Sequence, residues 1–234
     1  MRAGALRPAR RWVIAMDGPA GVGKSTVGQL VAKELGYRFI NTGEMYRALT
    51  WKALERGLDL ADEAAVLALA ESLKWDFKAV DGGVALKTFV DGEGVSARIR
   101  DERVGANSSL VAANRGVRRF MCRLQRRLGR GGGIVMEGRD IATHVFPDAD
   151  FKIYLDASID ERAARRYRQL KAAGVAADRQ KIKEAILTRD LNDLKRKINP
   201  LAQAADALVI DSTRLNLHQV ADRILKAVRA AHGG

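Results

Sequence analysis

The chain has 234 residues, of which 47% are hydrophobic but only 6% aromatic, so aliphatic side chains must fill most of the core. No apolar run approaches the ~18 residues of a membrane-spanning helix, and the single cysteine, Cys122, excludes a disulfide within the chain and fits a reducing compartment such as the cytoplasm. Lys and Arg outnumber Asp and Glu by 41 to 28, and the net charge of +13 predicts either a nucleic-acid surface or an enzyme that holds several phosphates.

The first half of the chain predicts alternating strands and helices. Residues 1–10 are basic and are expected to form a solvated tail, so residues 11–234 form a single domain of ordinary size. A short apolar run then leads into a glycine-rich turn, which is typical of a buried strand, and helical periodicities follow. The predicted elements are strands at 12–16 and 37–40 and helices at 24–35, 44–56 and 62–73.

The middle of the chain changes character. Alternating apolar residues surround the Asp81-Gly82 and Asp91-Gly92 pairs, which predicts an antiparallel hairpin with strands at 75–80 and 84–90. Because helices and strands alternate on both sides of it, we interpret this hairpin as a small insert.

The second half returns to short apolar strands joined by helices. This pattern predicts an α/β fold with a parallel sheet covered on both faces, and ligands bind such sheets beyond the carboxyl ends of the strands. The predicted elements are helices at 96–113, 117–128, 158–173, 181–194 and 217–231 and strands at 134–137, 151–155 and 207–210.

Residues 18–25 fit the phosphate-loop pattern G-x4-GK[ST] in full, between a predicted strand and a predicted helix. The glycines let backbone N–H groups face phosphate oxygens, and the N-terminus of the helix favours an anion. Lys24 is expected to contact the β- and γ-phosphates and Ser25 to bind Mg²⁺. The predicted ATP-binding residues are Gly18, Pro19, Ala20, Gly21, Val22, Gly23, Lys24, Ser25 and Thr26.

The phosphate loop does not identify the acceptor of the phosphate, but three polar clusters narrow the choice. They lie at residues 41–47, 137–140 and 189–196, each after a predicted strand or on a helix. In the last cluster Arg189, Asp193 and Arg196 share one helical face, because they are four and three residues apart. Such a face either clamps a phosphate together with a sugar or base, or forms exposed salt bridges, and the spacing leaves both open.

Taken together, these segments resemble the bacterial cytidylate kinases, which belong to the P-loop nucleoside monophosphate kinases and transfer the γ-phosphate of ATP to CMP or dCMP. The resemblance runs from about Val13 to the C-terminal helix, and the hairpin and the cluster at 189–196 are more specific than the phosphate loop. The segments that carry it are residues 17–26, 42–47, 90–96, 109–113, 138–140, 145–149, 154–158, 189–196 and 205–213.

The resemblance implies a P-loop NTPase-type sheet with an insert that binds the monophosphate, at about 42–105, and a helical lid at about 158–180. Arg47, Arg139 and Arg189 would hold the CMP phosphate, since a guanidinium matches phosphate with a fork of donors. The cytosine edge and the ribose would be bound by the remaining polar residues. The CMP-binding residues would be Thr42, Arg47, Ser109, Arg118, Arg139, Asp140, Arg189, Asp193 and Arg196.

The lid helix that starts at Ser158 is rich in arginine, and in the family this region covers ATP. Phosphoryl transfer needs charge stabilisation and exclusion of water, which arginines of a lid supply. Arg165 is our choice for a phosphate contact, although a solvated basic face explains the pattern equally well. The predicted catalytic residues are Lys24, Arg139, Arg189 and Arg165.

Two alternatives remain at this stage. The first is a kinase for another nucleoside monophosphate or a non-nucleotide acceptor. The second is a nucleic-acid-binding protein that uses a nucleoside triphosphate as a switch, but the chain lacks interleaved aromatics and RNA-binding motifs. We therefore expect ATP, CMP and dCMP as partners, Mg²⁺ as the metal and no stable nucleic-acid or membrane partner. Because family members are often monomeric, we also expect a monomer.

Overall fold

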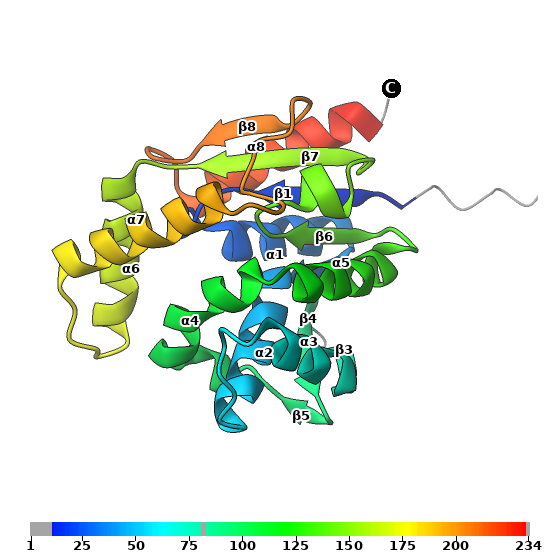
Figure 1. Ribbon diagram of the computed structural model, residues 1–234. Coiled ribbons are helices and arrows are strands. Elements are labelled where there is room, and N and C mark those ends of the chain that lie inside the picture. Colours follow the sequence, from blue (N-terminus) through cyan, green and yellow to red (C-terminus); the bar gives the residue numbers. More distant parts are fainter. Residues whose placement is uncertain (1–10, 81–82, 233–234) are drawn as a thin grey trace, which may run out of the picture.

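A mostly parallel sheet runs through the molecule, which is given by a computed structural model that describes residues 11–80 and 83–232 (Figure 1). The sheet has eight strands in the order β3-β4-β2-β6-β1-β7-β8, with β5 paired to β4. The strands are β1 (Val13–Asp17), β2 (Arg38–Asn41), β3 (Trp75–Ala79), β4 (Ala85–Val90), β5 (Glu93–Gly94), β6 (Ile134–Glu137), β7 (Phe151–Asp156) and β8 (Leu208–Asp211).

Helices cover both faces of the sheet, as predicted from the apolar strands. They are α1 (Lys24–Leu35), α2 (Thr42–Glu55), α3 (Glu63–Ser72), α4 (Glu102–Ala113), α5 (Arg115–Gly129), α6 (Ile159–Ala172), α7 (Arg179–Lys195) and α8 (Leu217–His232), with a 3₁₀ turn η1 (Arg98–Arg100) and a π-helical turn η2 (Ile141–Val145).

The side chains of β1 alternate between the cores on the two faces of the sheet. Ile14 and Met16 belong to a core shared with α1 and α8, whereas Ala15 belongs to a second core that includes residues of η2. Successive side chains of a strand point to opposite faces, so a fully buried strand contributes to both cores. The arrangement brings the carboxyl ends of β1, β2, β6 and β7 to one edge, where the phosphate loop begins.

The predicted hairpin is confirmed, and it extends the main sheet. β3 and β4 pair antiparallel, while β4 pairs parallel with β2, with Phe39 opposite Ala85 and Ile40 opposite Leu86. The turn at Asp91 and Gly92 has the positive φ values, 52° and 86°, that such a pair tolerates. The other predicted turn, at Asp81-Gly82, lies outside the described residues.

One predicted helix is wrong at its start. The helix expected over 96–113 begins as α4 at Glu102, after the 3₁₀ turn η1. Asp101 explains the boundary, since its backbone is not helical and its side chain accepts a hydrogen bond from the Arg103 N–H, as an N-cap does. Asn41 and Ser158 act as N-caps in the same way and fix the starts of α2 and α6.

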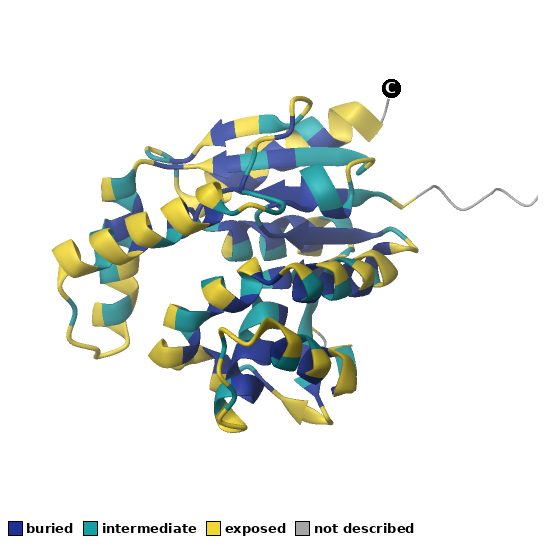
Figure 2. Cartoon of the chain, in the orientation of Figure 1, coloured by how far each residue is buried: buried dark blue, intermediate teal, exposed yellow. Residues whose placement is uncertain are grey.

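Helices α2, α3, α4 and α5 pack with the β3–β4 hairpin around a third core, which includes Met45, Leu69, Val90, Val111 and Met121. Helices α6 and α7 form a separate helical hairpin on the other side of the phosphate loop (Figure 1). Figure 2 shows that much of the outer part of this hairpin is exposed. The phosphate loop therefore lies between a packed helical unit and a projecting pair of helices.

Candidate active site

The phosphate loop has the backbone that its glycines predict. Gly18 has φ 145°, and a Cβ there would lie 2.0 Å from the Leu155 carbonyl oxygen of β7. Gly23 has φ 99° and precedes the first residue of α1, Lys24. A side chain at either position would strain the loop, so glycine is required where the chain turns from β1 into α1.

Lys24 is buried at the centre of this loop. Its Nζ donates hydrogen bonds to the Gly18 and Pro19 carbonyl oxygens, at 2.7 Å each. Burial and, second, the charge of Arg139 lower the pKa of Lys24 from its usual 10.5 to about 7. The ammonium is thus short of negative charge, which the phosphates of a nucleotide would provide.

Ser25 and Glu137 meet at the first turn of α1. The Ser25 hydroxyl donates to Glu137 Oε1 at 2.6 Å, and Asn41 Nδ2 donates to the same hydroxyl oxygen at 3.4 Å. Glu137 Oε2 is buried without a hydrogen-bond partner among residues 11–80 and 83–232. A hydroxyl and a carboxylate with a spare oxygen are the hard ligands that Mg²⁺ prefers, so these residues fit the metal.

Thr42 and Asp17 link the phosphate loop to the strand ends beside it. The Thr42 hydroxyl donates to the Glu137 carbonyl oxygen at 2.8 Å. Both carboxylate oxygens of Asp17 accept backbone N–H groups, from Ile141 at 2.9 Å and Ala142 at 2.8 Å. Burial nonetheless raises the pKa of Asp17 to about 6. Asp17 thereby fixes the start of η2, next to the predicted substrate residues of the 137–140 cluster.

Part of the predicted acceptor site is a buried network of ion pairs. Arg118 of α5 pairs with Asp140, and Arg196 lies 3.9 Å from the same carboxylate. Arg139 Nε donates to Asp193 at 2.8 Å, and Arg196 lies 3.7 Å from Asp193. Five predicted residues from three regions of the sequence therefore come together, with three arginines sharing two carboxylates, and each arginine lies within 4.0 Å of a carboxylate.

Tyr46, which was not predicted, belongs to this network. The Arg118 guanidinium lies 5.6 Å from the centre of its ring, a cation–π contact. Ser109 lies on α4 one turn before Ala112, whose carbonyl oxygen accepts from Arg118 at 3.1 Å. Arg118 thus contacts the same part of α4, and a shared base-binding role for Ser109 and Arg118 remains a prediction.

The other part of the acceptor site carries unbalanced positive charge. Arg189 Nε is buried and finds no acceptor within the described part of the chain. Burial and the charge of Arg139 lower the pKa of Arg189 to about 10, and burial lowers the pKa of Arg47. Arg139 and Arg189 also contribute to the low pKa of Lys24, so these four cations lie within electrostatic range of one another. Such a cluster is stabilised by a multiply charged anion.

Two arginines of the predicted lid helix, α6, contact the backbone of the phosphate loop. Arg165 donates to the Val22 carbonyl oxygen at 3.0 Å and to Ser212 Oγ at 3.1 Å, so it connects the phosphate loop to the segment that follows β8. A contact of Arg165 with phosphate remains a prediction. Arg162, one turn earlier and almost fully buried, donates to the Ala20 carbonyl oxygen at 3.0 Å and pairs with Asp190. The pairing of Arg162 and Asp190 was not predicted.

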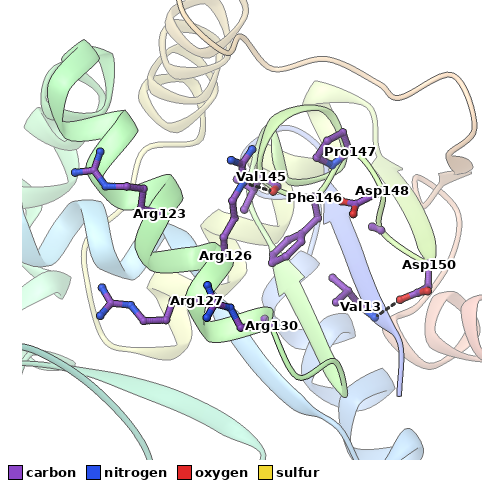
Figure 3. Close-up of a pocket in the computed structure, with 12 residues that line it drawn as sticks. Val13, Arg123, Arg126, Arg127, Arg130, Val145, Phe146, Pro147, Asp148 and Asp150 are labelled. Atoms are coloured by element: carbon purple, nitrogen blue, oxygen red, sulfur yellow. Dashed lines mark hydrogen bonds between the residues drawn. The ribbon is translucent and has the colours of Figure 1, made fainter. Parts of the chain in front are cut away.

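A groove of about 890 Å³ lies elsewhere, between the arginines at the end of α5 and the loop that precedes β7 (Figure 3). Val13, at the amino end of β1, lines it, so the groove is at the opposite edge of the sheet from the phosphate loop. Arg126 is held there by the His144 and Val145 carbonyl oxygens, at 2.6 and 2.8 Å. The groove is not part of the candidate active site.

Comparisons with known proteins agree with this geometry. The sequence model of the cytidylate kinase family matches residues 14–230. A cytidylate kinase of Bacillus velezensis is 45% identical over 215 residues, which cover 92% of this chain and 95% of the relative. A cytidylate kinase of Geobacillus thermodenitrificans is 46% identical over 224 residues, which cover 96% of this chain and 99% of the relative. A cytidylate kinase of Bacillus subtilis is 45% identical over 216 residues.

Proposed function

The chain belongs to the cytidylate kinase family, and we propose that it transfers the γ-phosphate of ATP to CMP or dCMP, giving ADP and the pyrimidine nucleoside diphosphate. One observation carries the proposal. The cations of the acceptor cluster, Arg139 and Arg189, lie close enough to the phosphate-loop lysine, Lys24, to lower its pKa. A donor phosphate on Lys24 and an acceptor phosphate on the two arginines would therefore lie next to each other.

ATP is bound on the phosphate loop. Its phosphates take the place of the Gly18 and Pro19 carbonyl oxygens as partners of the Lys24 ammonium. Ser25 and Glu137 would hold Mg²⁺, which supplies positive charge to the phosphate oxygens when it is bound. The loop thus orients the γ-phosphate and balances its charge, which is most of what phosphoryl transfer requires from a protein.

The acceptor phosphate is held by Arg47, Arg139 and Arg189. Burial and the charge of Arg139 lower the pKa of the other two arginines, and Arg139 itself also pairs with Asp193. An oxygen of this phosphate attacks the γ-phosphorus, the bond to the β-phosphate oxygen breaks, and ADP leaves with the bonding electrons. Because the cluster carries charge on both sides of the transferred group, it stabilises the negative charge that is shared between attacking and leaving oxygens.

The nucleoside of the acceptor lies against the ion-paired part of the site, around Asp140 and Asp193. Arg118 and Asp140 offer a donor and an acceptor side by side, which suits the polar edge of cytosine, and Ser109 completes this group. Asp193 and Arg196 would contact the ribose or deoxyribose. Thr42 positions the strand end beside them through its hydrogen bond to Glu137.

The same proposal extends to the metabolic role, the location and the oligomeric state of the protein. The product belongs to pyrimidine nucleotide metabolism, and the lone cysteine is compatible with the reducing cytoplasm. No helix in the described residues is long and apolar enough to cross a membrane. We propose a monomer, in which the outer part of the α6–α7 hairpin closes over ATP.

An initial-rate assay of ATP turnover with CMP, dCMP, UMP and AMP tests the function. We expect the first two acceptors to be phosphorylated with a higher kcat/KM than the last two. Equal values for AMP would favour a kinase for another acceptor. Tight, salt-sensitive RNA binding without CMP-dependent turnover would favour the nucleic-acid alternative.

The placement of Asp193 needs a separate experiment. Asp193→Ala is expected to raise KM for CMP and lower kcat/KM for CMP, while the affinity for ATP measured by equilibrium binding stays unchanged. Asn192→Ala, at the exposed neighbouring position on α7, serves as the control. An equal loss of ATP affinity would contradict the assignment of Asp193 to the acceptor.

A further inference from the structure

We propose that the buried pair Arg162–Asp190 couples the phosphate loop to the acceptor arginines, so that binding of one substrate raises the affinity for the other. The inference rests on the proposed function, since it assigns a regulatory role to residues between the two substrate sites. Arg162 and Asp190 are positioning residues, because they act through the loop and the helix that they join.

The two side chains form hydrogen bonds with both backbone groups of Ala20, a residue of the phosphate loop. The Ala20 N–H donates to Asp190 Oδ1 at 3.1 Å, and its carbonyl oxygen accepts from Arg162 Nη1 at 3.0 Å. Arg162 Nη1 also pairs with the second oxygen of Asp190, and Arg162 Nε donates to the Ala157 carbonyl oxygen at 3.0 Å. The backbone of one loop residue is thus bonded to both α6 and α7, through its N–H and its carbonyl group.

Asp190 is also joined to the acceptor site by its place in α7. Its neighbour in the chain is Arg189, which lies among the unbalanced cations, and Asp193 follows within the same helix. A helix moves as a rigid unit over such a short distance. When a phosphate draws Arg189 toward Arg139, Asp190 must either carry Ala20 with it or break the hydrogen bond to the loop.

Side-chain packing reinforces this connection. A Cβ on Gly21, the next residue of the phosphate loop, would lie 3.4 Å from Cβ of Arg162 and 3.8 Å from Cδ1 of Ile186. Gly21 therefore lies beside both α6 and α7, separated from them by about the width of a methyl group. This short separation and the hydrogen bonds at Ala20 connect the loop physically to the two helices, which is the condition for coupling between their ligands.

The burial of the pair indicates that stability alone does not explain it. Arg162 and Asp190 are each 7% exposed, although the hairpin that carries them projects from the molecule. Removing two charges from water costs about as much as their attraction returns, and an apolar pair of similar volume is often as stable. This ion pair also forms hydrogen bonds with the phosphate loop. Those bonds fix the position of the loop relative to α6 and α7, which apolar side chains cannot do.

The test is the ratio of the Kd for a non-hydrolysable ATP analogue without CMP to its Kd with saturating CMP, measured by titration calorimetry. Coupling between two sites commonly changes affinity by about 5- to 150-fold. We expect a ratio in this range for the unaltered protein and a ratio close to 1 for Asp190→Asn and for Arg162→Met. Because the two residues act as a unit, the double variant should show no further fall.

Lys183→Met provides the matched control. Lys183 also joins α6 and α7, through Asp160 at 2.7 Å, but this ion pair is exposed and does not contact the phosphate loop. We expect its ratio to equal that of the unaltered protein. If the hairpin were merely held together by its ion pairs, Lys183→Met and Asp190→Asn would lower thermal stability without changing the ratio.

Two outcomes overturn the proposal. One is an Asp190→Asn variant that is folded, as judged by its circular dichroism, and keeps the ratio of the unaltered protein. If that variant does not fold, the combination Arg162→Met with Asp190→Leu replaces both charges by apolar groups and is measured in its place. The other outcome is a ratio of 1 in the unaltered protein. Since CMP phosphorylation is assayed separately, that result would leave the proposed function standing.

Discussion

The two parts of the proposed acceptor site differ in how their arginines are paired. Around Asp140 and Asp193, each arginine has a carboxylate within 4.0 Å, although Arg118 Nε lacks an acceptor in the described structure. Around Arg189, by contrast, burial is combined with repulsion from Arg139, and together they lower the pKa of Arg189 to about 10. Both parts are rich in arginine, so residue type alone does not distinguish them.

The difference indicates which part recognises which portion of the substrate. A network in which carboxylates pair with arginines offers both acceptors and donors, which suits the edge of a base. A region with excess positive charge is instead poorly solvated until a phosphate arrives. The burial and mutual repulsion of these cations cost free energy in the free enzyme. Binding of an anion relieves this cost, so it strengthens the binding of the phosphate.

Removal of Lys24 is expected to have the largest effect of the variants that test this comparison. Lys24→Ala should lower kcat by about 10²–10³-fold or more, because it removes a buried donor aimed at the transferred phosphate. Steady-state kinetics with ATP and CMP measure this loss. Lys33→Ala, at the exposed end of the same helix, should leave kcat unchanged. An unaltered kcat in Lys24→Ala would remove the phosphate loop from the mechanism.

A substitution of Arg189 separates activity from stability in the unbalanced part. Arg189→Met should lower kcat/KM for CMP by about 10²-fold, because a phosphate ligand is lost. The same change should raise the melting temperature, since it removes a buried cation that repels Arg139. Arg179→Met, at an exposed position on the same helix, is the control for both measurements. A lower melting temperature would show that Arg189 is balanced after all.

The ion-paired part around Asp140 should lose stability instead. Arg118→Met leaves Asp140 buried without its nearest partner and should reduce the free energy of unfolding by about 3 kcal/mol. Arg118→Met combined with Asp140→Asn should recover part of that loss, because no uncompensated charge remains. Urea unfolding curves measure both, with the exposed Arg119→Met as control. Additive losses in the double variant would mean that the pair is not coupled.

Proton uptake is the smallest expected effect. The pKa of Lys24 is about 7 in the free protein, and the phosphates of ATP should raise it toward its usual 10.5. Binding at pH 8 should therefore take up a fraction of one proton, seen as a binding enthalpy that depends on the ionisation enthalpy of the buffer. Since the folded protein holds Lys24 with a lowered pKa, its stability should also rise between pH 7 and pH 10. Lys24→Met should abolish both effects.

The sequence was a good guide where a function depends on residues that are close along the chain. The phosphate loop is continuous, so its pattern and its flanking elements could be recognised together. The spacing of Arg189, Asp193 and Arg196 also predicted a shared helical face, and the contact between Asp193 and Arg196 agrees with it. For the same reason, the Asp91-Gly92 turn of the hairpin was predicted correctly.

Contacts between distant segments were not predictable in this way. Asp17 is bonded to N–H groups of Ile141 and Ala142, more than a hundred residues away, and nothing in its local sequence indicates this. The pairing of Arg162 with Asp190 depends in turn on how α6 and α7 pack. Likewise, the hairpin could be seen in the sequence, but its attachment to β2 could not, since parallel pairing leaves no local signal.

The hydrogen bonds of Lys24 to its own loop also affect how the enzyme releases its product. In the free protein the Lys24 amino group donates to the Gly18 and Pro19 carbonyl oxygens, so a departing nucleotide is replaced by acceptors of the loop itself. The loop competes with ADP for the same donor, and this competition weakens the hold on ADP and ATP alike. Where product departure limits turnover, a weaker hold shortens each catalytic cycle.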